Sequence, residues 1–442
     1  MLGPADVGYD EHRVGWNRAF RHRPAAIVVP VDGSDVVEAV RAARAGGLRL
    51  VVQATGHGVG VLADERSLLL DLRRLVGLSL DARARTVTVA GGTTWAPVLA
   101  ATAPLGLAPV LPEAVDVGIV GSTLGGGVGW LARRHGLSRD RVLAAHVVTA
   151  EGAEVVASAE GDRELWWGVR GGGVAGLGVV TSMTLELVAP SELHAGELCY
   201  PVEMAAEVLA RYSSWTEALP AAMTSTLAIE PGGPTGADDR AHPVVVLRGC
   251  YAGPADEAAD LVASWCTWAA PVEQRWGPIG IADLADRSRA AFAPRSSAVT
   301  TEWLRGLPDA AIAAICSIAL PSNGAPTLGR VELRHLAGAF DEGHGGPGAG
   351  PVPGVPGDLL LRAEGPVHHR GPTDPLAALR RALGESAVTT GGTYLNFTSG
   401  AERRERAATA FAPSSAERLA ALAGGLDPAG LLDHPLEPRG EG

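Results

Sequence analysis

Apolar positions in the first 190 residues alternate between strand-like and helical spacing. Residues 27–31 form a short β-rich run, and residues 36–45 repeat apolar side chains at helical intervals. The polar stretch 33–35 offers an N-cap for this helix, and Gly46-Gly47 ends it. Further predicted elements are strands within 48–56, 67–72, 86–92 and 176–190, a strand pair within 142–158, and a helix at 94–103 opened by Thr94. The pattern predicts an α+β domain with many glycine-bearing turns.

A different pattern follows Pro190 and continues from about residue 195 to residue 385. Hairpin-length apolar runs at 242–253 and 328–338 alternate with amphipathic segments at 204–219 and 256–269. This alternation predicts an antiparallel sheet backed by helices. Residues 343–357 form a loop rich in proline and glycine, which is either a surface excursion or a lid over a site.

Composition narrows the possible functions. The 442 residues are 46% hydrophobic and carry a net charge of −12, which argues against a nucleic-acid partner. All 37 basic residues are arginine, so a Walker A lysine, a Schiff-base lysine and a kinase lysine are excluded. The chain begins without a basic apolar leader and has no membrane-length apolar run, so we expect a cytoplasmic protein without a membrane partner. Four scattered cysteines predict neither a disulfide framework nor a metal site.

Two glycine-rich segments are candidates for ligand binding. Residues 53–60 place three glycines around His57 in a turn after a buried strand, where main-chain N–H groups can approach a pyrophosphate or a flavin ring. Residues 118–130 hold six glycines, but no acidic residue closes a dinucleotide-binding βαβ unit after them. A structural histidine in the first segment and a tightly packed turn without a ligand in the second remain alternatives.

Seven blocks in order resemble one family of flavoproteins. They are Gly8-Tyr9-Asp10 with Trp16-Asn17, the run 23–28, the turn at 55–58, the stretch 125–142, the run 164–186, Gly391–Phe397, and Leu426-Asp427-Pro428. In this order they are similar to the berberine-bridge-enzyme-like and 6-hydroxynicotine-oxidase-like flavoproteins, of the vanillyl-alcohol-oxidase superfamily. The resemblance implies an α+β fold with a two-lobed PCMH-type FAD-binding domain at 1–192. It also implies a substrate-binding domain with an antiparallel sheet backed by helices at 193–387, and a segment at 388–442 that returns to the FAD domain.

The resemblance also implies an FAD site. His57 would attach covalently to the 8α-methyl group of the flavin, with unlinked FAD as the alternative. The family's second, cysteinyl tether is absent, because Ala114 occupies its position and no cysteine precedes residue 199. The predicted cofactor-binding residues are Thr55, Gly56, His57, Gly58, Val59, Gly60, Gly118, Gly121, Ser122, Gly125, Gly126, Gly129, Val180 and Tyr394.

Catalytic candidates follow from the same comparison. Tyr394 and Asn396 match the family's Tyr-x-Asn-Tyr region, but its last phenol is replaced by Phe397, which cannot accept a proton. Tyr394 is therefore predicted to handle a proton or to position the flavin, with a packed structural role as the alternative. Asp116 stands where the family has a threonine, and it and Glu113 are either acid/base groups or part of a solvated loop face.

The expected function is a two-electron oxidation of a small organic substrate, such as a secondary-metabolite intermediate, with dioxygen as electron acceptor. The protein would be a monomer or a homodimer. One alternative is a cyclase that keeps the FAD scaffold and closes a ring without net oxidation. The other is a binding protein without a cofactor.

Overall fold

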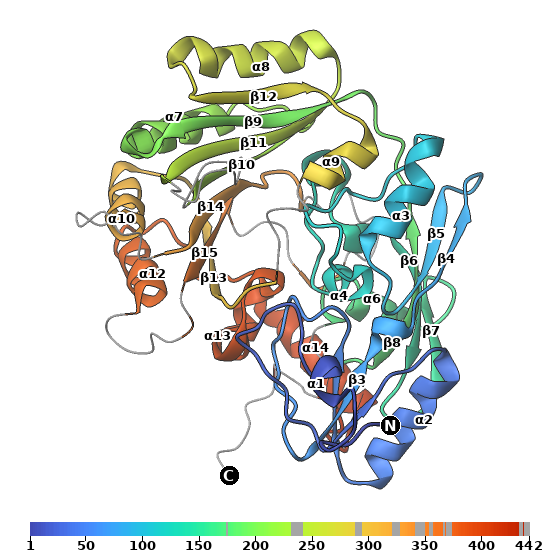
Figure 1. The fold of residues 1–442 in the computed structure, drawn as a ribbon. Coiled ribbons are helices and arrows are strands. Elements are labelled where there is room, and N and C mark those ends of the chain that lie inside the picture. Colours follow the sequence, from blue (N-terminus) through green and yellow to red (C-terminus); the bar gives the residue numbers. More distant parts are fainter. Residues whose placement is uncertain are drawn as a thin grey trace.

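Two lobes lie side by side in the computed structural model (Figure 1). It describes residues 1–173, 176–230, 242–287, 294–320, 328–340, 350–352, 357–365, 367, 374–432 and 436. The first lobe holds a three-stranded and a five-stranded sheet, and the second holds a seven-stranded sheet. The predicted α+β fold is confirmed. No helix among the described residues is long and apolar enough to span a membrane.

The three-stranded sheet of the first lobe is parallel, with β1 (Ala26–Val28), β3 (Ser67–Asp71) and β2 (Arg49–Gln53) in that order. The predicted helix is α2 (Gly33–Ala45), and it buries its apolar stripe against these strands. Its N-cap is Asp32 rather than the predicted 33–35 stretch, because the Asp32 carboxylate accepts the Asp35 N–H at 3.0 Å. Strand β2 ends directly before the glycine turn, so this sheet positions His57.

The five-stranded sheet is antiparallel and follows the order β4-β5-β8-β6-β7. The strand pair predicted within 142–158 is present as β6 and β7. The elements of this half of the lobe are β4 (Leu78–Asp81), β5 (Thr86–Ala90), α3 (Trp95–Thr102), α4 (Ile119–Leu124), α5 (Ala132–His135), β6 (Val142–Val148), β7 (Glu154–Ser158), α6 (Arg163–Val169) and β8 (Val179–Glu186); α1 (Tyr9–His12) precedes β1.

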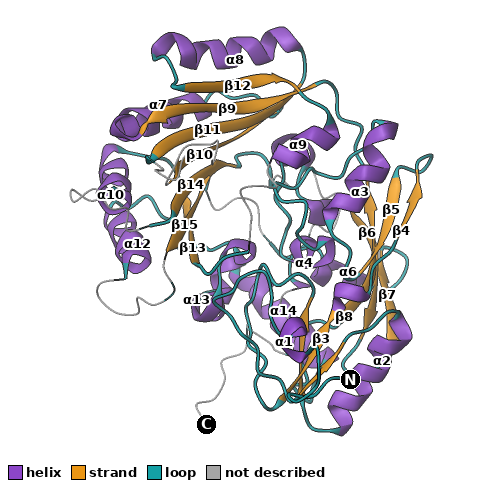
Figure 2. Cartoon of the chain, viewed as in Figure 1, coloured by secondary structure: helices purple, strands orange, loops and turns teal. Residues whose placement is uncertain are grey.

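The second lobe confirms the predicted antiparallel sheet backed by helices. Its strands follow the order β12-β9-β11-β10-β14-β15-β13, and every neighbouring pair is antiparallel. Its elements are β9 (Leu193–Pro201), α7 (Ala205–Thr216), β10 (Met223–Glu230), β11 (Val244–Ala252), α8 (Ala255–Trp268), β12 (Glu273–Pro278), α9 (Ile281–Arg287), β13 (Ala298–Leu304), α10 (Asp309–Ala319), β14 (Arg330–His335), β15 (Leu359–Gly365) and α12 (Pro375–Glu385). Helices α7, α8, α10 and α12 lie on the outer side of the sheet (Figure 2).

The two faces of this sheet differ in polarity. On β14, Val331 and Leu333 point into the apolar core shared with the helices. The alternate residues Arg330, Glu332 and Arg334 point to the opposite face, as the two-residue period of a strand requires. Charged side chains therefore cover the face that is turned toward the first lobe.

Arg133 fastens the two lobes together. Its guanidinium leaves α5 and donates to the carbonyl oxygens of Pro220, Met223 and Ala337 at 2.6–2.8 Å. The side chain is 6% exposed, and burial lowers the pKa of Arg133 to about 10. The contact therefore consists of charge-assisted hydrogen bonds to main chain rather than of an ion pair.

We expect Arg133→Met to lower the free energy of unfolding by about 3 kcal/mol, because the carbonyl groups stay buried and lose their donors. Arg83→Met is the control, since that arginine lies on an exposed turn between β4 and β5. Denaturant unfolding followed by tryptophan fluorescence measures both. A change below about 0.5 kcal/mol for Arg133→Met would show that the lobes do not depend on this contact.

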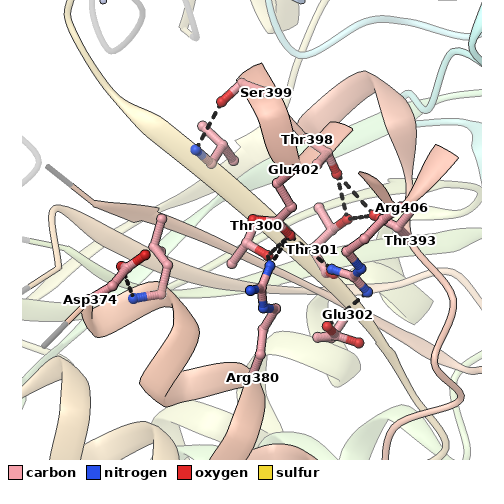
Figure 3. Close-up of polar contacts among 12 residues, drawn as sticks. Thr300, Thr301, Glu302, Asp374, Arg380, Thr393, Thr398, Ser399, Glu402 and Arg406 are labelled. Atoms are coloured by element: carbon pink, nitrogen blue, oxygen red, sulfur yellow. Dashed lines mark hydrogen bonds and ion pairs between the residues drawn. The ribbon is translucent and has the colours of Figure 1, made fainter. Parts of the chain in front are cut away.

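The C-terminal segment is tied to the edge strand β13 (Figure 3). Thr301 Oγ1 lies 2.9 Å from Thr393 Oγ1 and 3.0 Å from Thr398 Oγ1, while Arg406 forms ion pairs with Glu302 and with Glu402. The segment continues into α13 (Gly400–Glu405) and α14 (Pro413–Leu426), and α14 packs on α6 of the first lobe. These contacts bring residues 394–399 between the lobes.

The loop predicted at 343–357 falls mostly on residues outside those that the structure describes. The four cysteines carry no disulfide; Cys199 and Cys250 are buried, and Cys266 and Cys316 are partly exposed. Among the described residues, no cluster of three or more histidine, cysteine or acidic side chains could hold a metal ion.

Candidate functional site

A cavity of about 430 Å³ lies where the lobes and the C-terminal segment meet. One side is formed by the glycine turn and the start of α4, and the other by β13, β14 and β15. It brings together most of the residues predicted from the sequence. The predicted residues that line it are Thr55, Gly56, His57, Gly58, Val59, Gly60, Gly118, Gly121, Ser122, Val180 and Asn396.

The glycine turn presents its N–H groups to this cavity. Its carbonyl oxygens face the protein: Thr55 and Gly56 accept the N–H groups of Trp16 and Asn17, and Val59 accepts that of Gly400. In the part of the chain that the structure describes, the N–H groups of 56–60 donate to no protein acceptor. Val59 is buried and Gly56, His57 and Gly60 are partly buried, so a run of main-chain donors without a protein acceptor beside the cavity fits a ligand that is rich in oxygen or nitrogen acceptors.

A side chain at position 56 would prevent this geometry. Gly56 has φ +71°, and a Cβ added to it would lie 2.4 Å from the Cα of Gly15. The chain just after α1 and the turn therefore touch backbone to backbone, which only glycine allows here. Asn17 extends this contact to the second lobe, since its Nδ2 donates to Ser297 O at 2.9 Å.

His57 is held on three sides. Its ring stacks on Trp16 at 4.6 Å between centroids, and its Nδ1 lies 2.8 Å from Thr55 Oγ1. Its Nε2 is buried and makes no hydrogen bond, while the nearest carboxylate oxygen, Asp116 Oδ2, is 3.7 Å away. When Nδ1 carries the proton and donates to Thr55, the lone pair of Nε2 is free to act as a nucleophile.

These features fit FAD. Unpaired N–H groups on the turn suit the phosphates or the ring carbonyls, and the imidazole nitrogen without a partner suits an attachment at the flavin edge. Gln53 Nε2 is a further buried donor on the cavity wall without a partner. The residues that would hold the cofactor are the cavity-lining glycines, Thr55, His57, Ser122 and Val180.

The glycine-rich stretch divides into glycines that line the cavity and glycines that lie behind its wall. Gly125, Gly126 and Gly129 do not line the cavity, whereas Gly127 does. A Cβ at Gly125 would lie 1.8 Å from Asn396 Oδ1, and one at Gly126 would lie 2.7 Å from the Tyr394 hydroxyl. These two glycines therefore admit the C-terminal segment. Gly129 is pressed against the carbonyls of the preceding loop.

Tyr394 lies beside the main cavity rather than on its wall. It is 3% exposed and borders a separate small hollow. Burial raises the pKa of Tyr394 to about 12, and Asn396 Nδ2 donates to its hydroxyl at 3.4 Å. A neutral phenol packed this closely against Gly126 favours the structural alternative over proton transfer.

Asn396 and Asp116 take different places. Asn396 lines the cavity, and its Nδ2 donates to Ser122 O at 2.7 Å. Asp116 does not line the cavity; its side chain is 46% exposed and stands beside His57. Glu113 does line the cavity and pairs with Arg334, so it does not belong to a solvated loop face.

The wall opposite the glycine turn carries arginines that the sequence analysis missed. Arg334 and Arg362 line the cavity, and their guanidinium carbons lie 4.7 and 5.3 Å from the centre of the Phe397 ring. Arg334 pairs with Glu113 and Glu332, and Arg362 pairs with Glu364. The available signal was the alternation of charged residues in 330–334, which on a half-buried strand marks a polar inner face.

Comparison with known proteins bears on the glycine-rich segments that line the cavity. A family model described as an FAD binding domain matches residues 24–158, a segment that contains both glycine-rich segments. (R)-6-hydroxynicotine oxidase of Paenarthrobacter nicotinovorans is 33% identical over 198 residues, which are 44% of this chain and 43% of that protein. Berberine bridge enzyme-like 27 of Arabidopsis thaliana is 33% identical over 172 residues, or 38% of this chain and 32% of that protein. The matched segments span less than half the length of these relatives.

The fold extends the similarity beyond these segments. The solved structure of 6-hydroxy-D-nicotine oxidase from Arthrobacter nicotinovorans has a TM-score of 0.81 at 24% identity, covering 99% of this chain and 96% of that one. The chain thus has the two-lobed fold of that structure, and its residues 24–158 match an FAD-binding domain. Its sequence is similar to FAD-linked oxidoreductases of the berberine bridge enzyme-like and 6-hydroxynicotine oxidase kind.

Proposed function

We propose that this chain is an FAD-dependent oxidase that removes two electrons from a small organic substrate. The observation that supports it most directly is the single cavity between a wall of unpaired N–H groups and a wall of charged side chains. Residues 1–192 and 388–442 would hold FAD, and residues 193–387 would cover the substrate. When bound, FAD would accept a hydride from the substrate and pass two electrons to dioxygen.

His57 is the proposed site of covalent attachment to the 8α carbon of FAD. Stacking on Trp16 and the contact with Thr55 fix its ring. The Asp116 carboxylate, 3.7 Å from Nε2, would stabilise the positive charge that the imidazole gains when Nε2 forms the bond. A cysteinyl link is not proposed, because Ala114 lines the cavity at the position where the family carries the thiol.

The chain's own residues suggest how a substrate proton is handled. Glu113 is the sole carboxylate among the described residues that line the cavity, so we assign it the role of base. Asn396 lines the same space and would contact flavin or substrate through its amide. Asp116 would act on His57 rather than on the substrate.

A visible spectrum and an intact mass, taken before and after denaturation, test the first part of the proposal. We expect a yellow protein whose mass retains one FAD after denaturation. Anaerobic addition of a substrate should bleach the flavin, and air should restore the colour. A colourless protein that takes up no FAD on reconstitution would refute the proposal.

A cyclase on the same scaffold is the second candidate. The observation that favours it is the lack of any tyrosine among the described cavity-lining residues, with Phe397 at the position of the family's phenol. Product formed under nitrogen with unchanged flavin absorbance would support the cyclase and contradict the oxidase.

A further inference from the structure

The two arginines on the charged wall of the cavity, Arg334 and Arg362, differ in how completely carboxylates neutralise them. Arg334 and Arg362 come from neighbouring antiparallel strands and are diagonal neighbours, because Arg334 stands opposite Leu360 and Glu332 stands opposite Arg362. Side chains in this relation on one face of a sheet can act on one ligand. The Phe397 ring touches both guanidinium groups and keeps them side by side.

Arg334 is fully compensated. It is 3% exposed and pairs with two carboxylates, Glu113 from the first lobe and Glu332 on its own strand. Glu332 in turn pairs with Arg330. The carboxylates around Arg334 therefore have cationic partners already, and Glu113 has little free charge to offer to a cationic substrate.

Arg362 is less completely compensated. Its one carboxylate partner among the described residues is Glu364, and Glu364 also pairs with Arg295. The Arg362 side chain lines the cavity and is 12% exposed. Its Nε is buried and makes no hydrogen bond. Burial is the largest influence on this guanidinium and lowers the pKa of Arg362. An anionic acceptor that enters the cavity would accept a hydrogen bond from Arg362 Nε and would balance the charge of the guanidinium.

A second arginine on the cavity wall also lacks full neutralisation by a carboxylate. Arg403 from α13 donates to Gly58 O at 3.0 Å and forms no ion pair within the described part of the chain. It lines the cavity together with Arg362. Of these two cavity-lining arginines, only Arg362 has a carboxylate partner among the described residues, and that partner, Glu364, also pairs with Arg295. Arg362 and Arg403 therefore give this end of the cavity an excess of positive charge.

We propose that Arg362, beside Arg334 and Phe397, binds a carboxylate group of the substrate, so that the enzyme acts on a small organic acid. The planar guanidinium fork matches a carboxylate, and the apolar neighbours Pro112, Val299 and Phe397 suit a flat hydrocarbon body. Glu113, the cavity carboxylate paired with Arg334, would receive the proton from the substrate oxygen or nitrogen while the attached carbon gives its hydride to FAD. The inference rests on the proposed function and names its substrate class.

Titration of the purified, flavin-loaded protein with benzoate, benzamide and benzylamine tests the inference. Each probe is followed by its perturbation of the visible flavin spectrum. We expect benzoate to bind at least about tenfold more tightly than its neutral isostere benzamide, which corresponds to one good charge-assisted contact. Benzylamine should bind most weakly. Equal affinities for benzoate and benzamide, or tightest binding by benzylamine, would overturn the inference.

Variants locate the effect. Arg362→Gln should weaken benzoate about tenfold and leave benzamide unchanged, and Arg362→Lys should restore part of the affinity because it keeps the charge but not the fork. Arg248→Gln is the matched control: Arg248 lies on the same face of the same sheet, is paired with Glu197 and Glu230, and does not line the cavity. Unchanged benzoate binding in Arg362→Gln would contradict the assignment.

The outcomes separate this inference from the proposed function. A protein without FAD would refute the proposed function before any probe is added. A yellow protein that does not prefer benzoate would refute only the carboxylate site. The comparison of probes on the unmodified protein does not depend on whether any variant folds.

Discussion

His57→Ala is expected to abolish covalent attachment of FAD while leaving the fold intact. The ring occupies a partly buried place against Trp16, and no other described histidine lines the cavity near the glycine turn except His22, which is buried and paired with Gln53. Removing the imidazole removes the nitrogen that would form the bond, but it leaves the N–H groups of the turn in place. The intact mass should fall by one FAD, and acid precipitation should release all flavin into the supernatant.

Two further variants make this result specific. Thr55→Val removes the hydroxyl that fixes Nδ1 and should slow the attachment without preventing it, because the imidazole is still present. His146→Ala removes an exposed histidine on β6 and should change nothing. Flavin that stays bound to denatured His57→Ala protein would mean that another residue forms the link. Flavin that is already free in the unmodified protein would refute the tether but not FAD binding.

Gly129→Ala is expected to lose stability, and Gly121→Ala is expected to lose FAD without losing stability. A Cβ at Gly129 would lie 2.0 Å from Val110 O and 2.5 Å from Leu111 O, so the backbone must move. We expect a loss of about 3 kcal/mol in the free energy of unfolding, the upper range for overpacking. A Cβ at Gly121 meets no protein atom within 4 Å and stands in the cavity wall. Gly121→Ala should therefore keep the stability of the cofactor-free protein and lose FAD.

Denaturant unfolding of cofactor-free protein and flavin content after purification measure the two effects separately. Gly384→Ala is the control, since its Cβ also meets nothing within 4 Å but lies on α12, away from the cavity. Full FAD occupancy in Gly121→Ala would show that the cofactor does not approach the start of α4. Unchanged stability in Gly129→Ala would show that the loop at 110–111 yields easily.

Patterns among neighbouring residues were enough to predict much of the fold and the glycine turn on the proposed cofactor side of the site. Helix α2, the pair β6 and β7, and the helix-backed antiparallel sheet were predicted from spacing alone, because each depends on contacts within a few residues or on one apolar face. The turn at 55–60 was predicted because glycines around a histidine after a buried strand are a local signal. Its neighbours Trp16 and Gly15 were not assigned a contact with it, since they meet the turn only across the fold.

The residues on the proposed substrate side of the cavity could be assigned only from the tertiary structure. Arg334 and Arg362 reach the cavity because β14 and β15 are neighbours in the sheet and because their charged face turns toward the first lobe. In the sequence, both look like solvent-facing residues of amphipathic strands. Likewise, only the tertiary structure places Asn396 and Tyr394 of the C-terminal segment against Gly125 and Gly126.

The sequence by itself thus determined a glycine turn that presents a histidine, because that geometry is set by neighbouring residues, and the family resemblance related this turn to FAD. Only the tertiary structure decided which charges face the cavity and that Tyr394 packs behind it. Those assignments follow from contacts between segments more than 200 residues apart, such as the hydrogen bond from Asn396 Nδ2 to Ser122 O at 2.7 Å. The periodicity of a single strand or helix cannot specify such pairings.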